Sequence, residues 1–70
     1  MASFEHTIGE AAGVLWKTLK TKGPMPVARV VKEANVSGDL VMEAIGWLAR
    51  EGKIDLVDDA AKKIKLLKLR

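Results

Sequence analysis

The chain has 70 residues, of which 49% are hydrophobic and 30% are charged, and this composition is typical of one small globular domain covering residues 1–70. It has no cysteine and one histidine, His6, so disulfides are excluded and a metal site would need carboxylate ligands. The formal net charge of +3 permits binding to nucleic acid or to an anionic surface without requiring either.

Several function classes have little support in the sequence. No apolar run approaches the roughly 20 residues of a membrane-spanning helix, and residues 1–6 lack the features of a signal peptide, so we expect a cytoplasmic protein. His6 has no Ser, Cys or Asp partner in a catalytic pattern, and Asp55, Asp58 and Asp59 match no calcium-loop spacing. We therefore expect no enzyme activity, no cofactor, no metal and no small-molecule substrate.

The first predicted element is an amphipathic helix. Between residues 8 and 19 apolar side chains recur at spacings of three and four, and either Ser3 or Thr7 can serve as the N-cap. The Gly-Pro pair at 23–24 ends this helix. Because each proline biases the residue before it toward extended geometry, residues 24–26 are predicted to form a short extended link.

The next segment predicts a helix-turn-helix. A second helix is expected over residues 26–34, and Asn35 suits the left-handed conformation that closes a helix. Ser37 is a good N-cap for a third helix over residues 38–51, which Gly52 ends.

The last segment predicts a two-stranded hairpin. Residues 53–57 alternate polar and apolar, and residues 63–66 do so again after an expected turn at 58–60. Beyond residue 66 the alternation slips by one, so we expect a bulge or a frayed end that leaves Leu67 and Leu69 exposed. A basic membrane-surface helix is the alternative, but its apolar residues would scatter around the helix axis.

This order of elements predicts an α+β winged helix-turn-helix fold, in which a three-helix bundle is followed by a two-stranded wing. Two strings with glycine and tryptophan at fixed places agree with it: Ile8-Gly9-Glu10-Ala11-Ala12-Gly13-Val14-Leu15-Trp16 and Ala44-Ile45-Gly46-Trp47-Leu48-Ala49-Arg50-Glu51-Gly52-Lys53-Ile54. They resemble a small bacterial and archaeal family of winged helix-turn-helix domains that has no assigned function. The resemblance covers nearly the whole chain. It implies the fold and a homodimer, and it implies no catalytic or DNA-contacting residue.

The third helix is a poor candidate for reading bases. A recognition helix contacts base edges with Arg, Lys, Asn or Gln, and residues 37–49 contain none of these. The outward face is expected to present Asp39 and Glu43, with Met42 nearby, and carboxylates are repelled by phosphates. Arg50 is the one cation of this helix, and at the C-terminal end it suits the helix dipole better than a base.

The wing is the better candidate, because lysines can contact phosphates without reading sequence. The candidate nucleic-acid-binding residues are Lys62, Lys63, Lys65, Lys68, Lys53 and Arg50. The lysines of residues 17–22 could add to them. The alternative interpretation, which stays open, is that alternating lysines form a solvated strand edge that prevents aggregation.

The third helix is also apolar around more than half of its circumference, which one core-facing stripe does not need. Either it is central in the fold, or part of it faces a partner. The candidate interface residues are Trp47, Met42, Leu67 and Leu69.

Glycines 9, 13 and 46 lie within predicted helices, where glycine is unfavourable, so we expect close backbone contacts there. Two hypotheses follow: a DNA-binding, transcription-regulator-like protein, or a homodimeric protein-interaction module.

Overall fold

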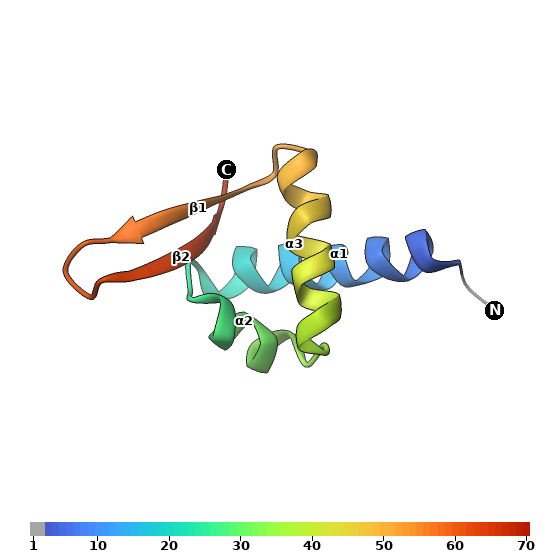
Figure 1. Ribbon diagram of the computed structural model, residues 1–70, viewed down its shortest axis with the longest axis horizontal. Coiled ribbons are helices and arrows are strands. Elements are labelled where there is room, and N and C mark those ends of the chain that lie inside the picture. Colours follow the sequence, from blue (N-terminus) through green and yellow to red (C-terminus); the bar gives the residue numbers. More distant parts are fainter. Residues whose placement is uncertain (1–2) are drawn as a thin grey trace.

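The computed structural model describes residues 3–70; Met1 and Ala2, which the predicted domain includes, lie outside the described residues. Its elements in chain order are α1 (Phe4–Lys22), α2 (Val27–Ala34), α3 (Gly38–Arg50), β1 (Ile54–Asp59) and β2 (Ile64–Leu69). This order confirms the predicted fold class of three helices and a hairpin. Figure 1 shows α3 crossing α1 and the hairpin extending away from the helices on one side.

The helix ends follow from local capping. The Ser3 side chain accepts a hydrogen bond from the His6 N–H at 3.1 Å, so Ser3 is the N-cap of α1 and the helix begins one turn before Thr7. Asn35 closes α2 in the left-handed conformation, at φ 55° and ψ 44°, as predicted. Ser37 caps α3. Both α2 and α3 are one residue shorter than predicted, because the residues at their expected ends are caps.

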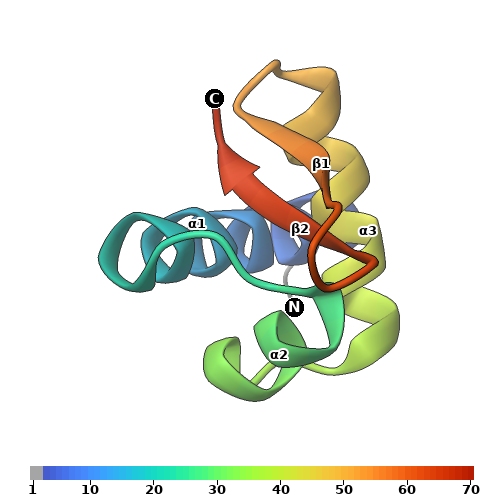
Figure 2. The ribbon, with the colours of Figure 1, turned by 90° about the vertical axis from the view of Figure 1, so that its left-hand side faces the viewer.

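The core draws one or more apolar side chains from every helix and from the hairpin. Its buried members within residues 3–70 are Ala11, Ala12, Leu15, Leu19, Met25, Val30, Val41, Ala44, Leu48, Ile54 and Leu67. No polar or charged residue of the described chain is buried among them. The core therefore lies where α1, α2 and α3 meet the base of the hairpin. Figure 2, which views the molecule from the hairpin side, shows α1 and α3 behind the hairpin with α2 below it.

The extended link between α1 and α2 forms an isolated β-bridge with β2. Met25 donates its N–H to the Leu67 carbonyl at 3.1 Å and accepts from the Leu67 N–H at 2.8 Å. The Met25 side chain is 1% exposed. Because β2 lies between this link and β1, the base of the hairpin is hydrogen-bonded on both sides of β2 and cannot move independently of the helices.

The hairpin pairs without a bulge, and this corrects one prediction. The register runs from Ile54 opposite Leu69 to Asp59 opposite Ile64. Leu67 is 1% exposed and Leu69 is partly buried against the core, so neither is the exposed leucine that the slipped alternation predicted. The strand presents Leu67 and Leu69 to the core and turns its other face away. In residues 63–66 the apolar side chains, Ile64 and Leu66, lie on the face of the strand opposite to Leu67 and Leu69. These residues lie beyond the edge of the core, where no packing determines which face is buried.

The turn also lies later than predicted. Asp58 and Asp59 are the last residues of β1, and residues 60–63 make the connection to β2. The two aspartates were interpreted as turn residues because aspartate is common in turns. Their placement in a strand decides which charges face the lysines of β2.

Candidate nucleic-acid interface

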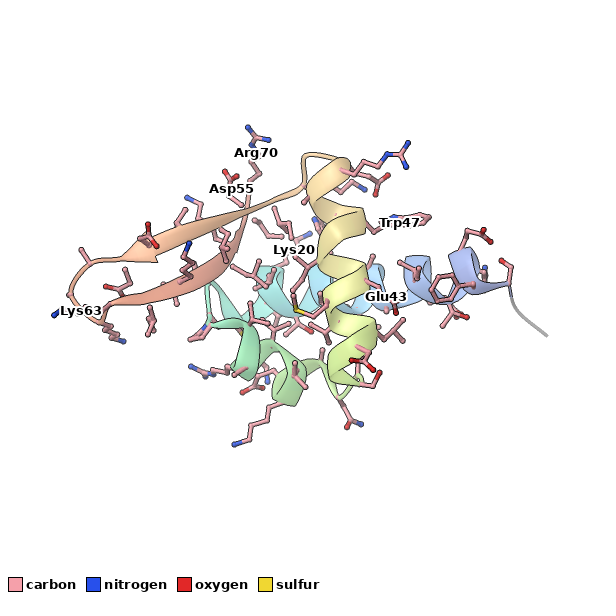
Figure 3. The ribbon with its side chains drawn as sticks, in the orientation of Figure 1. Lys20, Glu43, Trp47, Asp55, Lys63 and Arg70 are labelled. Carbon is pink, nitrogen blue, oxygen red and sulfur yellow. The ribbon has the colours of Figure 1, made fainter. Side chains whose placement is uncertain are left out.

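The hairpin tip presents two lysines at the free end of the molecule. The Asp59 carboxylate accepts hydrogen bonds from the N–H groups of Ala61, at 3.2 Å, and Lys62, at 3.3 Å. That carboxylate is therefore engaged by the turn backbone. The Lys62 and Lys63 side chains are exposed, and Figure 3 shows Lys63 at the end of the hairpin that is farthest from the helices. Lys62 and Lys63 are called the tip lysines below.

The backbone at the tip is unusual for a lysine. Lys63 has φ 54°, in the left-handed region, where a side chain is unfavourable by about 1–2 kcal/mol relative to ordinary conformations. Glycine or asparagine usually occupies such a position. The hairpin therefore closes with a lysine where glycine would be less strained.

The lysines of β2 lie opposite aspartates of β1. The register places Lys65 opposite Asp58 and Lys68 opposite Asp55. Asp55 also forms an ion pair with Arg70 at 3.6 Å. The basic segment of residues 62–70 is thus partly neutralised by the neighbouring strand, whereas the tip lysines lie outside the ladder and have no aspartate opposite them. The three aspartates of β1 were the available signal, and it was missed because two of them were assigned to the turn.

Two further predicted contributors lie away from the tip. Lys53, just before β1, contacts Glu51 at 3.9 Å, and both side chains are about half exposed. Arg50 is exposed in the last turn of α3. Among the described residues, Arg50 forms no ion pair within 4.0 Å, which leaves the helix dipole as its nearest electrostatic partner. The structure therefore does not bring Lys53 and Arg50 together with the tip lysines.

Two lysines of α1 have partners of their own. Lys22 forms an ion pair with Glu33 of α2, and Arg29 also contacts Glu33, at 3.5 Å. The hydrogen bond and the charge of Lys22, with a smaller effect of Arg29, lower the pKa of Glu33. Lys20 lies over the Trp16 ring, 4.8 Å from its centroid, in a cation–π contact. Lys20 and Lys22 thus stabilise contacts within the chain.

The outward face of α3 is acidic and apolar, as expected. Asp39, Glu43 and Gly46 are exposed, and Met42 is 58% exposed. In Figure 3 Glu43 and Trp47 project from the side of α3 that faces away from the hairpin. A helix with this surface has no donor for a base edge, and its carboxylates oppose entry into a groove lined by phosphates.

A second surface lies where α1 meets the C-terminal part of α3. Trp16 and Trp47 are 37% and 38% exposed. Beside Trp16 is a depression of about 250 Å³, lined by Ala12, Gly13, Trp16, Leu48, Glu51 and Lys53. Sequence reasoning named Trp47 as a candidate interface residue, but it did not find the depression, which forms only because α1 and α3 cross.

The close backbone contacts expected at three glycines are not found. A Cβ on Gly9 would lie 3.8 Å from Cζ2 of the Trp47 side chain, an ordinary van der Waals distance. A Cβ on Gly13 or Gly46 would meet no atom within 4 Å. The expectation was therefore wrong, because no backbone of another element lies against these positions.

Residues 3–70 contain no group of three or more His, Cys, Asp or Glu residues placed to hold a metal ion. Within the same residues, none of the helices combines the length and the apolar character needed to cross a membrane.

Three helices joined to a hairpin, whose base is hydrogen-bonded to the link at Met25, define a winged helix-turn-helix domain. A family model described as a winged helix-turn-helix domain (DUF2582) matches residues 3–67, and the chain belongs to this family. The chain is also 35% identical over 63 residues to the uncharacterized protein MJ1608 of Methanocaldococcus jannaschii, across 87% of this chain and 90% of that protein. No solved structure matches the chain. The match confirms the family predicted from the two glycine and tryptophan strings.

Proposed function

We propose that this domain binds nucleic acid, with duplex DNA as the principal ligand, by placing the tip lysines against the phosphate backbone. The observation that supports this most directly is the position of Lys62 and Lys63. They are exposed at the projecting end of a hairpin whose base is fixed to the core, and the register gives them no carboxylate opposite. A rigid arm that ends in two cations suits contact with phosphates, which requires charge and reach but no base-specific donors.

The proposal gives α3 no role in the groove. Its exposed face offers Asp39, Met42 and Glu43, so binding through α3 would bring carboxylates toward phosphates. Recognition is therefore independent of sequence, and any regulatory role in transcription requires a partner that supplies specificity. We place this function in the cytoplasm and assign no catalytic step to the domain.

The conformation of Lys63 adds a second, independent argument. A left-handed residue at a hairpin tip favours glycine for stability, whereas a lysine there is strained. Unfavourable backbone conformations of this kind are concentrated at functional positions. Phosphate contact gives the lysine side chain a use that offsets its conformational cost.

The test is a titration of the protein against mixed-sequence duplex DNA at 50 and 150 mM NaCl, followed by fluorescence anisotropy of a labelled duplex. Each phosphate contact contributes about −0.9 to the slope of log K against log salt, so two contacts weaken binding roughly sevenfold across this range. Lys32→Ala, an exposed lysine on α2, is the control and should leave the slope unchanged. Absence of binding at 50 mM NaCl, or affinity independent of salt, would contradict the proposal.

A protein-interaction module is the second candidate function. It is favoured by the exposure of Trp16 and Trp47, because large aromatic side chains are concentrated at the centres of protein interfaces. In this case the lysines of β2 would form a solvated strand edge and the tip lysines a solvated turn. A protein that forms a stable oligomer and shows no salt-dependent affinity for DNA would support this candidate over the first.

A further inference from the structure

We propose that the depression beside Trp16 binds a free aromatic α-amino acid, with phenylalanine as the representative ligand. The ring of the ligand would lie on the apolar floor of the depression, and its ammonium and carboxylate groups would pair with Glu51 and Lys53 at the rim. The ligand is bound without chemical change. The inference does not depend on nucleic-acid binding, and it is tested without DNA.

The floor of the depression is apolar and belongs to the core. Ala12 of α1 and Leu48 of α3 line it, and they are 2% and 3% exposed. The Trp16 ring forms a wall, and the Lys20 ammonium lies over that ring at 4.8 Å from its centroid. Close-packed core residues and a ring held by a cation–π contact do not collapse into an adjacent space. The depression is therefore a preformed apolar surface, which is the usual character of a small-molecule site.

The size of the depression matches one aromatic ring. Its volume is about 250 Å³, below the roughly 300–1,000 Å³ of sites for drug-sized ligands. A cavity of about 150 Å³ is enough for benzene, so a ring with a short polar head group fits. An aromatic ligand is favoured over an aliphatic one, because a ring packed against Trp16 gains more than its buried area alone provides.

Gly13 keeps the depression open. It lines the depression, it is exposed, and a Cβ built on it meets no atom within 4 Å. Glycine inside a helix is less favourable than alanine, and nothing within this chain requires a missing side chain at this position. A longer residue here would occupy the space beside Trp16. A ligand that uses this space gives the absent side chain a function.

Two opposite charges stand at one edge of the depression. Oε1 of Glu51 and Nζ of Lys53 are 3.9 Å apart, which is longer than a hydrogen bond, and both side chains are about half exposed. Within residues 3–70, neither group forms a second ion pair. Each group therefore keeps the capacity to bind an opposite charge from outside the chain.

The backbone that carries these charges is fixed by the end of α3. Gly52 adopts φ 70°, and its N–H donates to the Ala49 carbonyl at 3.0 Å. The Lys53 N–H donates to the Leu48 carbonyl, also at 3.0 Å. These two hydrogen bonds form a Schellman motif, which closes the helix and holds the chain that follows it. The charged residues are thus placed before a ligand arrives, which lowers the entropic cost of binding.

The pair of charges selects the head group of the ligand. An amino acid carries an ammonium and a carboxylate on one carbon, so it can place the first against Glu51 and the second against Lys53. An aromatic amine or an aromatic acid satisfies one of these residues and meets a like charge at the other. An aromatic residue inside a peptide chain carries neither charge on its backbone. The free amino acid is therefore the best match to this rim.

The first test is a two-dimensional NMR titration of the isotope-labelled protein with L-phenylalanine. The chain has two tryptophans, and the indole N–H signal of Trp16, which lines the depression, should move while that of Trp47 should not. A ligand of this size should bind with a Kd on the order of 1 mM. Phenethylamine, phenylpropionate and N-acetylphenylalaninamide should each bind about fivefold more weakly, because each lacks one or both of the charges.

The second test uses variants of the depression. Gly13→Gln should weaken phenylalanine binding at least tenfold by filling the space, and circular dichroism should show undiminished helix content, because glutamine is the better helix former. Gly46→Gln, at an equally open glycine inside α3 but outside the depression, is the matched control and should bind like the wild-type protein. Lys53→Gln should weaken phenylalanine binding about threefold without weakening phenethylamine, which does not use Lys53.

Four outcomes would overturn the proposal. A Trp16 signal that does not move at about 20 mM phenylalanine would exclude the site, because this concentration is far above the expected Kd. Equal affinities for the amino acid, the amine and the acid would exclude recognition by Glu51 and Lys53. Tighter binding of N-acetylphenylalaninamide would assign the depression to an aromatic side chain of a protein partner. Unchanged binding by Gly13→Gln would place the ligand elsewhere on the chain.

Discussion

The two ends of the hairpin differ in what holds them, although they belong to the same two strands. At the base, Ile54 and Leu67 are buried and β2 is hydrogen-bonded to the link at Met25. At the tip, Ile64 is 37% exposed, because the strands have left the core. The base therefore determines stability, while the tip is free to present side chains to a ligand. The predictions below test this division.

The largest expected effect is at the base. Leu67→Ala should reduce the free energy of unfolding by about 2–5 kcal/mol, because it removes a fully buried side chain and leaves a cavity. Ile64→Ala, at the tip end of β2 and 37% exposed, should cost less, about 1 kcal/mol. Urea denaturation of both variants measures the difference. Equal losses would mean that the two ends of the hairpin are packed alike.

An effect of intermediate size is expected at the tip, with opposite signs for stability and binding. Lys63→Gly should raise the free energy of unfolding by about 0.5–1 kcal/mol, because glycine tolerates φ 54° without strain. The same variant should bind duplex DNA more weakly and flatten the salt slope by about 0.9. Thermal melts and anisotropy titrations on one preparation give both values. A variant that gained stability without losing affinity would show that the strained backbone at Lys63 has no role in DNA binding.

The smallest effect is expected outside the hairpin and depends on pH. The Lys22 ion pair lowers the pKa of Glu33 below its ordinary value of 4.5, so the ionised carboxylate stabilises the folded chain. This contribution is fully present above pH 4.5 and is lost as the pH falls through the lowered pKa. Glu33→Gln should flatten the acid side of the stability curve measured by urea denaturation. An unchanged curve would show that the contact between α1 and α2 adds no pH dependence.

The sequence predicted the helices well, because their signals are local. Asn35 and Ser37 cap helix ends through contacts within a few residues, and the apolar spacing of α1 needs no knowledge of the rest of the fold. The ambiguity between Ser3 and Thr7 arose because both have N-cap chemistry, and the fold extends α1 to the earlier residue.

The orientation and charge of the hairpin were harder to predict. Alternation shows that a strand has two faces, but the core decides which face is buried, and it contacts only the base. Leu67 was therefore assigned to the wrong side. In the same way, the lysines of β2 appeared as part of a basic segment without acidic residues, because the aspartates that oppose them belong to the other strand and become neighbours only in the ladder. Of the residues predicted to contact nucleic acid, the proposed function keeps the tip lysines.

The most direct test of the central claim, that the hairpin tip rather than α3 contacts nucleic acid, compares two double variants. The first is Lys62→Ala with Lys63→Ala, and the second is Asp39→Asn with Glu43→Gln; their affinities for mixed-sequence duplex DNA are measured across a salt series. The account predicts that the first loses affinity and about 1.8 from the salt slope, while the second stays within about twofold of the wild-type protein. An unchanged first variant, together with a second variant that binds at least tenfold more tightly, would place α3 at the phosphates and contradict the account.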